Sequence, residues 1–249
     1  MNVLLADSRG GGMLKRLRGM LDHAEVKPGA RMKQLTGLVQ GAVPSTYRQK
    51  NPTHVYVMAG INDVTERVES PTLSTYKYKE VICVEDPHSI AQRVISDIDD
   101  CAREINKYGA IPVFATISKA NIAKYNQIQL NDNHTTAHLH QNDSYPTMQT
   151  NLETSIDIIN DHIRQLNRTH EVSTPLCHNV IIRRRARKKQ YKAHDWSALG
   201  DGIHGTWKTR NLWAKSLRAA MSHNKGSFED STGSPKRSWK FEKRPKPSI

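Results

Sequence analysis

The chain has 249 residues, of which 37% are hydrophobic, and it carries a formal net charge of +13. This size suits one α/β domain with or without a tail, and no apolar stretch approaches the roughly 20 residues that span a membrane. The large positive charge is unusual for an enzyme of small neutral substrates and favours a polyanionic partner.

The chain opens with a short apolar run, Val3 to Ala6, which ends in Asp7, Ser8 and then three glycines. This pattern predicts a buried strand and a tight turn. A helix is predicted next from apolar residues spaced four apart, namely Met13, Leu17 and Leu21. Ser8 therefore lies at the carboxyl end of the first strand, where open α/β sheets place their ligands. The alternative is that Asp7 or Ser8 only caps the turn.

A second polar motif follows another predicted strand. Residues 54–59 are rich in β-branched and aromatic side chains, and Gly60-Ile61-Asn62-Asp63 comes directly after them. Gly60 allows the backbone to turn sharply. The Asn62 amide can donate a hydrogen bond without carrying a charge, which suits an oxyanion hole. The alternative is a simple Asx turn.

Strand and helix patterns go on alternating through the middle of the chain. Asp86 followed by Pro87 predicts the start of a helix. The other expected elements are a short helix at 32–39, an apolar helical stripe at 90–105, a strand at 111–117, a helix at 148–166 and a fifth strand at 178–182. Such alternation predicts an α/β fold with a five-stranded parallel sheet and right-handed crossovers.

Three segments interrupt this pattern: a loop at 65–86, a polar insertion at 118–145 and a basic tail at 222–249. The insertion follows a strand, so we expect it to border the site as a lid. The tail is poor in apolar residues, and we predict a folded domain at 1–221 followed by a disordered tail. The insertion contains His134, His138 and His140, but no acidic or cysteine ligand lies nearby at a familiar spacing. We therefore predict no metal and no cofactor.

The third motif is Asp201-Gly202-Ile203-His204. At this spacing in a loop, the Asp201 carboxylate can accept a hydrogen bond from the Nδ1–H group of His204. The imidazole tautomer is then fixed, and Nε2 is free to take a proton from a serine. A helix is predicted from Thr206 to about Met221. The alternative is an ordinary Asp–His surface pair.

Taken in order, the three motifs resemble the SGNH (GDSL-type) hydrolases. The resemblance implies a flavodoxin-like three-layer α/β/α sandwich and hydrolysis of a small acyl ester through an acyl-serine intermediate. It implies that Ser8 is the nucleophile and that Asp201 and His204 complete the triad. It also implies an oxyanion hole formed by Asn62, the Ser8 N–H and a glycine N–H. Gly29 matches that glycine best, with Gly37 and Gly41 as further candidates.

The sequence departs from the family pattern around the serine. Ala6 stands where the family usually has glycine, and Arg9 follows Ser8 directly. The methyl group of Ala6 is expected to press on the turn that carries Ser8. Esterase domains of this kind also occur in proteins of LINE-type retrotransposons, so a mobile-element or virus-encoded member is one reading of the basic composition.

A run of basic residues follows the predicted fifth strand and carries a second candidate function. It consists of Arg183, Arg184, Arg185, Arg187, Lys188 and Lys189. With few aromatic residues nearby, this run and the basic tail would together bind RNA or DNA through phosphates, with little sequence preference. The alternatives are a solvated loop or a nuclear-import signal. Three scattered cysteines and no predicted leader indicate an intracellular protein, cytoplasmic or nuclear; the sequence leaves the oligomeric state open.

Overall fold

The computed structural model describes residues 1–43, 52–69, 79–83, 85–132, 144–183 and 193–231. Its centre is a parallel sheet of four strands in the order β2-β1-β3-β6. These strands are β1 (Asn2–Ala6), β2 (His23–Val26), β3 (His54–Met58) and β6 (Ile111–Phe114). Every residue of β3 is buried, as expected for a central strand with both faces covered.

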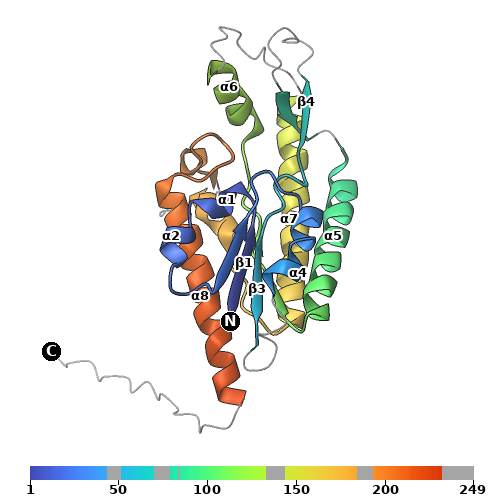
Figure 1. Cartoon of the computed structure of the whole chain (residues 1–249). Coiled ribbons are helices and arrows are strands. Elements are labelled where there is room, and N and C mark those ends of the chain that lie inside the picture. Colours follow the sequence, from blue (N-terminus) through green and yellow to red (C-terminus); the bar gives the residue numbers. More distant parts are fainter. Residues whose placement is uncertain (44–51, 70–78, 84, 133–143, 184–192, 232–249) are drawn as a thin grey trace, which may run out of the picture.

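Alternate side chains of the sheet enter two separate hydrophobic clusters. Val3 and Leu5 of β1 belong to the first cluster, whereas Leu4 and Ala6 belong to the second. The first face is covered by α3 (Met32–Thr36), α4 (Val39–Ala42), α5 (Pro87–Lys107) and α7 (Tyr145–Thr169). The second is covered by α2 (Leu14–Leu17) and α8 (Trp207–Ser231) (Figure 1). The predicted three-layer α/β/α fold is thus confirmed.

Helix α5 begins as the sequence predicts. The Asp86 carboxylate accepts a hydrogen bond from the Ser89 backbone N–H at 2.9 Å, and Pro87 occupies the first turn. The helix predicted around residues 13–21 is instead two short pieces, α1 (Ser8–Gly11) and α2. The glycine-rich turn divides them, so the apolar spacing reflects packing under α8 rather than one continuous helix.

The predicted fifth strand at 178–182 is wrong. These residues form the 3₁₀ helix η3 (Cys177–Ile181) and enter β7 (Ile182–Arg183), which pairs antiparallel with β8 (Ala193–His194). On the outer edge of β6, the backbone groups of Phe114 form hydrogen bonds with a side chain and not with a further strand. Asn167 of α7 accepts from the Phe114 N–H at 2.9 Å and donates to the Phe114 carbonyl at 2.7 Å. At Phe114, an amide side chain therefore supplies the two hydrogen bonds that a neighbouring strand would make.

The interrupting segments also carry regular structure. The predicted 65–86 loop contains an antiparallel hairpin, β4 (Glu66–Glu69) with β5 (Lys79–Ile82), and the predicted insertion contains α6 (Ile122–Asp132). Helix α8 extends past the predicted domain boundary at 221 to Ser231, so the first part of the predicted tail is helical. Residues 232–249 lie outside the described residues. Within the described part of the chain, no helix combines the length and apolarity needed to cross a bilayer.

Candidate active site

Ser8 is the first residue of α1, and only Asp7 separates it from the end of β1 at the carboxyl edge of the sheet. Asp7 fixes this turn, because its backbone N–H donates to the Met58 carbonyl at 3.1 Å and its side chain accepts from the Arg9 N–H at 2.8 Å. The Ala6 methyl group is accommodated by Gly10. A Cβ atom on Gly10 would lie only 2.3 Å from that of Ala6. Gly10, two residues after the serine, thus compensates for the departure from the family pattern at position 6.

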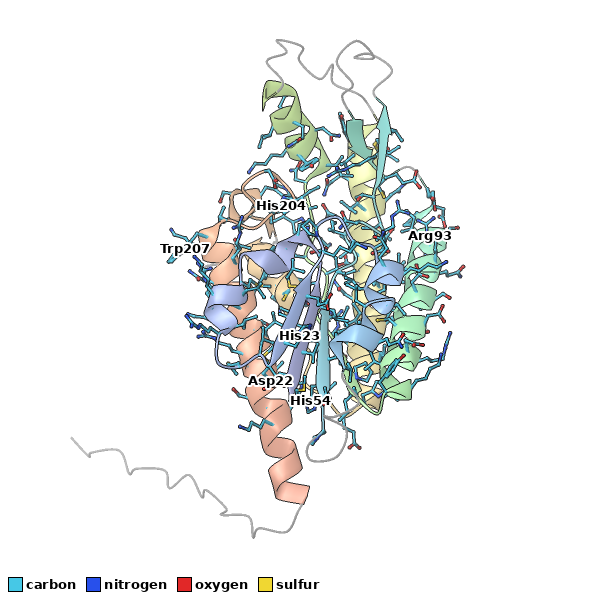
Figure 2. All side chains as sticks on the ribbon, viewed as in Figure 1. Asp22, His23, His54, Arg93, His204 and Trp207 are labelled. Atoms are coloured by element: carbon cyan, nitrogen blue, oxygen red, sulfur yellow. The ribbon has the colours of Figure 1, made fainter. Side chains whose placement is uncertain are left out.

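The structure brings Ser8, His204 and Asp201 into one hydrogen-bonded chain. The Ser8 Oγ atom lies 3.0 Å from Nε2 of His204, and Nδ1 of His204 lies 2.6 Å from an Asp201 carboxylate oxygen. All three side chains are half-buried. Figure 2 shows His204 near the carboxyl end of the sheet, far from His23 and His54. This is the geometry in which an imidazole accepts a proton from a serine while a carboxylate fixes its orientation.

The Asp201 carboxylate is held in its ionised form. Burial by itself would raise the pKa of Asp201, but hydrogen bonds from the His204 side chain and from the backbone N–H groups of His204 and Ile203 outweigh it. The pKa of Asp201 therefore lies well below its ordinary value. An ionised carboxylate can accept the Nδ1–H hydrogen bond, which leaves Nε2 of the neutral imidazole facing Ser8.

Asn62 and Asp63 tie two sheet-edge loops together. The Asn62 side-chain amide donates to the Ala30 carbonyl at 3.1 Å. Both oxygens of Asp63 lie near the Met32 N–H, at 3.0 and 3.1 Å. The motif after β3 therefore anchors the loop after β2, an anchoring role that the sequence analysis missed. Within the described part of the chain the second hydrogen of the Asn62 amide has no partner, so it can be donated to a ligand.

The predicted oxyanion residues line one cavity. Ser8, Gly29, Asn62 and His204 all border a space of about 530 Å³. Gly29 has φ of +73°, a left-handed conformation that favours glycine. Of the further candidates, Gly37 ends α3 and Gly41 lies within α4, and neither borders this cavity. The geometry thus favours Gly29 among the three.

Arg9, the second departure from the family pattern, is buried and does not line the cavity. Its Nη1 donates to the Ser118 carbonyl at 2.8 Å, and its guanidinium carbon lies 5.8 Å from the centre of the Trp213 ring. Burial lowers the pKa of Arg9, and burial likewise raises the pKa of the neighbouring Asp7. Arg9 therefore helps to fix the turn that carries Ser8 without bordering the cavity.

The loop that carries Asp201 and His204 rests on α6. The Lys124 ammonium group donates to the Leu199 carbonyl at 2.6 Å and to the Trp196 carbonyl at 3.2 Å. The Asn121 N–H donates to the Gly202 carbonyl at 2.8 Å. Part of the predicted polar insertion therefore supports the histidine loop.

Several predicted features fall partly or wholly outside the described residues. Of the basic run, Arg183 lies in β7, and Arg184, Arg185, Arg187, Lys188 and Lys189 are not described. The histidines of the insertion, 134, 138 and 140, are not described either. Among the residues that are described, no group of three or more His, Cys, Asp or Glu side chains is placed to hold a metal ion. The three cysteines, all described, are buried free thiols.

Solved structures with the same architecture are hydrolases. A protein from Bacteroides fragilis, described as a candidate acylhydrolase, matches with a TM-score of 0.56 and 12% identity, covering 90% of this chain and 86% of that one. A GDSL-like lipase from Bacteroides thetaiotaomicron matches with a TM-score of 0.55 and 11% identity, covering 90% and 88%. The chain has the fold of a GDSL-like hydrolase. No family model matches the sequence, and a search of curated proteins found no significant match.

At this level of identity the likeness concerns the fold alone. The GDSL-like fold explains why the three motifs converge, since each follows or flanks an element that ends at the carboxyl edge of the sheet. It leaves open the substrate, and nothing in the comparisons bears on a mobile-element or viral origin or on nucleic-acid binding.

The buried carboxyl group of Asp63 gives a pH-dependent stability that can be measured. Burial raises the pKa of Asp63 to about 6. Between about pH 4 and 6 the folded state then binds more protons at this site than the unfolded state, so stability falls as pH rises. We expect the free energy of unfolding of the wild type, relative to Asp63→Asn, to drop by roughly 2–3 kcal/mol from pH 4 to pH 7.

Urea unfolding of both proteins at several pH values measures this difference. Taking the difference between the two proteins removes the contribution of the other titrating groups. If the free energies of unfolding of the wild type and of Asp63→Asn change equally from pH 4 to pH 7, the Asp63 carboxyl does not have the raised pKa described above.

Proposed function

We propose that the protein is a serine esterase of SGNH type that hydrolyses small acyl esters through an acyl-serine intermediate. The observation that carries this proposal is the continuous chain of hydrogen bonds from Ser8 through His204 to Asp201 at the wall of a cavity. The GDSL-like fold supports it.

The first half of the reaction forms the acyl-serine. The Ser8 Oγ atom attacks the carbonyl carbon of the ester while His204 Nε2 takes the hydroxyl proton. When the tetrahedral intermediate collapses, His204 returns that proton to the leaving alkoxide, which departs as the alcohol. Asp201 keeps the imidazole in the required tautomer and stabilises the imidazolium.

The second half uses water. His204 takes a proton from a water molecule that attacks the acyl carbonyl, and it then returns the proton to Ser8 Oγ as the carboxylic acid leaves. In both halves the negative charge on the carbonyl oxygen is stabilised by the Asn62 amide and by the backbone N–H groups of Ser8 and Gly29. All three residues border the cavity.

Hydrolysis of p-nitrophenyl acetate tests the proposal and the role of Asn62 together. We expect wild-type activity above the buffer rate and unaffected by EDTA. Asn62→Ala is expected to lose about 2–4 kcal/mol of transition-state stabilisation, seen mainly in kcat.

Asp63→Ala is the matched control, because Asp63 anchors the same loop through Met32 but does not border the cavity. We expect it to retain far more activity than Asn62→Ala. Equal losses in the two variants would mean that Asn62 acts only by anchoring the loop. An inactive wild type would overturn the proposed esterase function.

A further inference from the structure

Two arginines border the cavity together with the catalytic side chains. Arg31 precedes α3, Arg67 lies in β4, and both share the cavity wall with Ser8. Of the described residues that border the cavity, none is an aspartate or a glutamate. The space beside the candidate nucleophile is therefore positively charged.

Neither arginine is within ion-pair distance of a carboxylate in the described part of the chain, although Arg31 is close enough to Asp63 to lower the pKa of that buried carboxyl. Arg93, on α5, is by contrast paired with Glu85 at 3.0 Å. The two acids nearest the site have their own hydrogen-bond partners: Asp63 is buried and accepts from the Met32 N–H, and Asp201 is bonded to His204. An anion in the cavity would face little competition.

Arg67 is also positioned in advance. Its Nη2 donates to the hydroxyl of Tyr125 at 3.3 Å, and Tyr125 is a buried residue of α6 that borders the same cavity. This one hydrogen bond orients the exposed Arg67 side chain toward the cavity, and the planar fork of a guanidinium matches a carboxylate or a phosphate. Among the described residues, the apolar part of the lining is limited to Pro28, Val81, Ile203 and the ring of Tyr125, so a long acyl chain would bury little apolar surface there.

We propose that the cavity selects esters that carry a carboxylate or phosphate group, bound by Arg31 and Arg67 while the ester carbonyl lies at Ser8. This inference rests on the proposed esterase function and names its substrate class. The reaction is unchanged: water is consumed, the ester bond breaks, and an acid and an alcohol form, one of them carrying the anionic group. The net charge of +13 also favours the approach of anionic substrates.

Matched esters test the selection. The first set shares an acetyl group: 4-acetoxybenzoate, 4-acetoxyphenyl phosphate and the neutral methyl 4-acetoxybenzoate. A second pair places the charge on the acyl side: mono-4-nitrophenyl adipate against 4-nitrophenyl hexanoate. The measured quantity is the ratio of kcat/KM for the anionic ester to that for the neutral one, so intrinsic differences in reactivity cancel between variants.

We expect this ratio to fall about 10- to 100-fold in the Arg31→Gln/Arg67→Gln double variant for at least one anionic ester. The anionic ester whose kcat/KM ratio falls most shows which anionic group the arginines bind, a carboxylate or a phosphate. It also shows whether that group lies on the acyl side or the alcohol side of the ester. Arg93→Gln removes an equal charge from outside the cavity, and its ratio should match the wild type. Added salt should also reduce the wild-type ratio.

Two results would overturn the inference. If the wild type hydrolyses the neutral esters and the double variant keeps the wild-type ratios, the esterase function stands and the anion selection is wrong. If the wild type hydrolyses none of these esters, the proposed function and the substrate class are both wrong.

Discussion

Ser8→Ala and His204→Ala are each expected to lower kcat for p-nitrophenyl acetate by roughly two orders of magnitude or more. The reason is the 3.0 Å contact between Ser8 Oγ and His204 Nε2, which makes one side chain the nucleophile and the other its base. Without either partner, the acyl-serine cannot form by this route. The residual rate should reflect only binding and the oxyanion donors.

Matched variants separate this effect from general damage. Ser197→Ala removes an exposed hydroxyl that bonds to Asp195, and His23→Ala removes a histidine at the opposite end of the sheet (Figure 2). Both should retain wild-type rates. The Ser8→Ala/His204→Ala double variant should be about as impaired as either single variant, because the two residues act as a unit. Full activity in Ser8→Ala would remove Ser8 from the mechanism.

Asp201→Asn is expected to reduce kcat by roughly three to four orders of magnitude while leaving the fold intact. The asparagine Oδ1 atom can still accept from the backbone N–H groups of Ile203 and His204, as Asp201 does. Its Nδ2 group, however, would donate toward Nδ1 of His204. The imidazole would then carry its proton on Nε2, and it could no longer accept from Ser8.

Asp195→Asn is the control for this variant. Asp195 lies in the same region of the chain, and its carboxylate accepts from the Ser197 backbone N–H at 3.2 Å. Asp201 likewise accepts from the backbone N–H of the residue two positions later, Ile203. We expect it to keep wild-type activity. A loss below about tenfold in Asp201→Asn, with thermal stability unchanged, would mean that Asp201 does not set the tautomer of His204.

Much of the architecture could be predicted from local patterns. The Asp86-Pro87 signal marks the start of α5, and the buried run at 54–58 is β3. The convergence of Ser8, Asn62 and His204 on one cavity followed from a topological rule, since they follow or flank elements that end at one edge of the sheet. Elements whose signals lie within a few neighbouring residues could therefore be predicted from the sequence alone.

The features that could not be predicted correctly depend on contacts between segments that are distant in the sequence. The segment 178–182 ends in three β-branched residues, which favour a strand, but Asn167 already bonds both backbone groups of Phe114 on the edge of β6. The compensation between Ala6 and Gly10 could not be predicted either. The sequence shows that Ala6 departs from the family pattern, but only the structure shows that Gly10 leaves room for its methyl group. Arg31 and Arg67 are far apart in the sequence, and only the folded chain brings them to the cavity that Ser8 lines.

The central claim is that Ser8 is an activated nucleophile, and labelling with a fluorophosphonate tests it most directly. Such reagents phosphonylate a serine whose hydroxyl is deprotonated by a neighbouring base. We expect the wild type to gain one phosphonyl group, located by peptide mass spectrometry on the segment that contains Ser8, and Ser8→Ala to gain none. An unlabelled wild type, or a label that persists in Ser8→Ala, would contradict the claim.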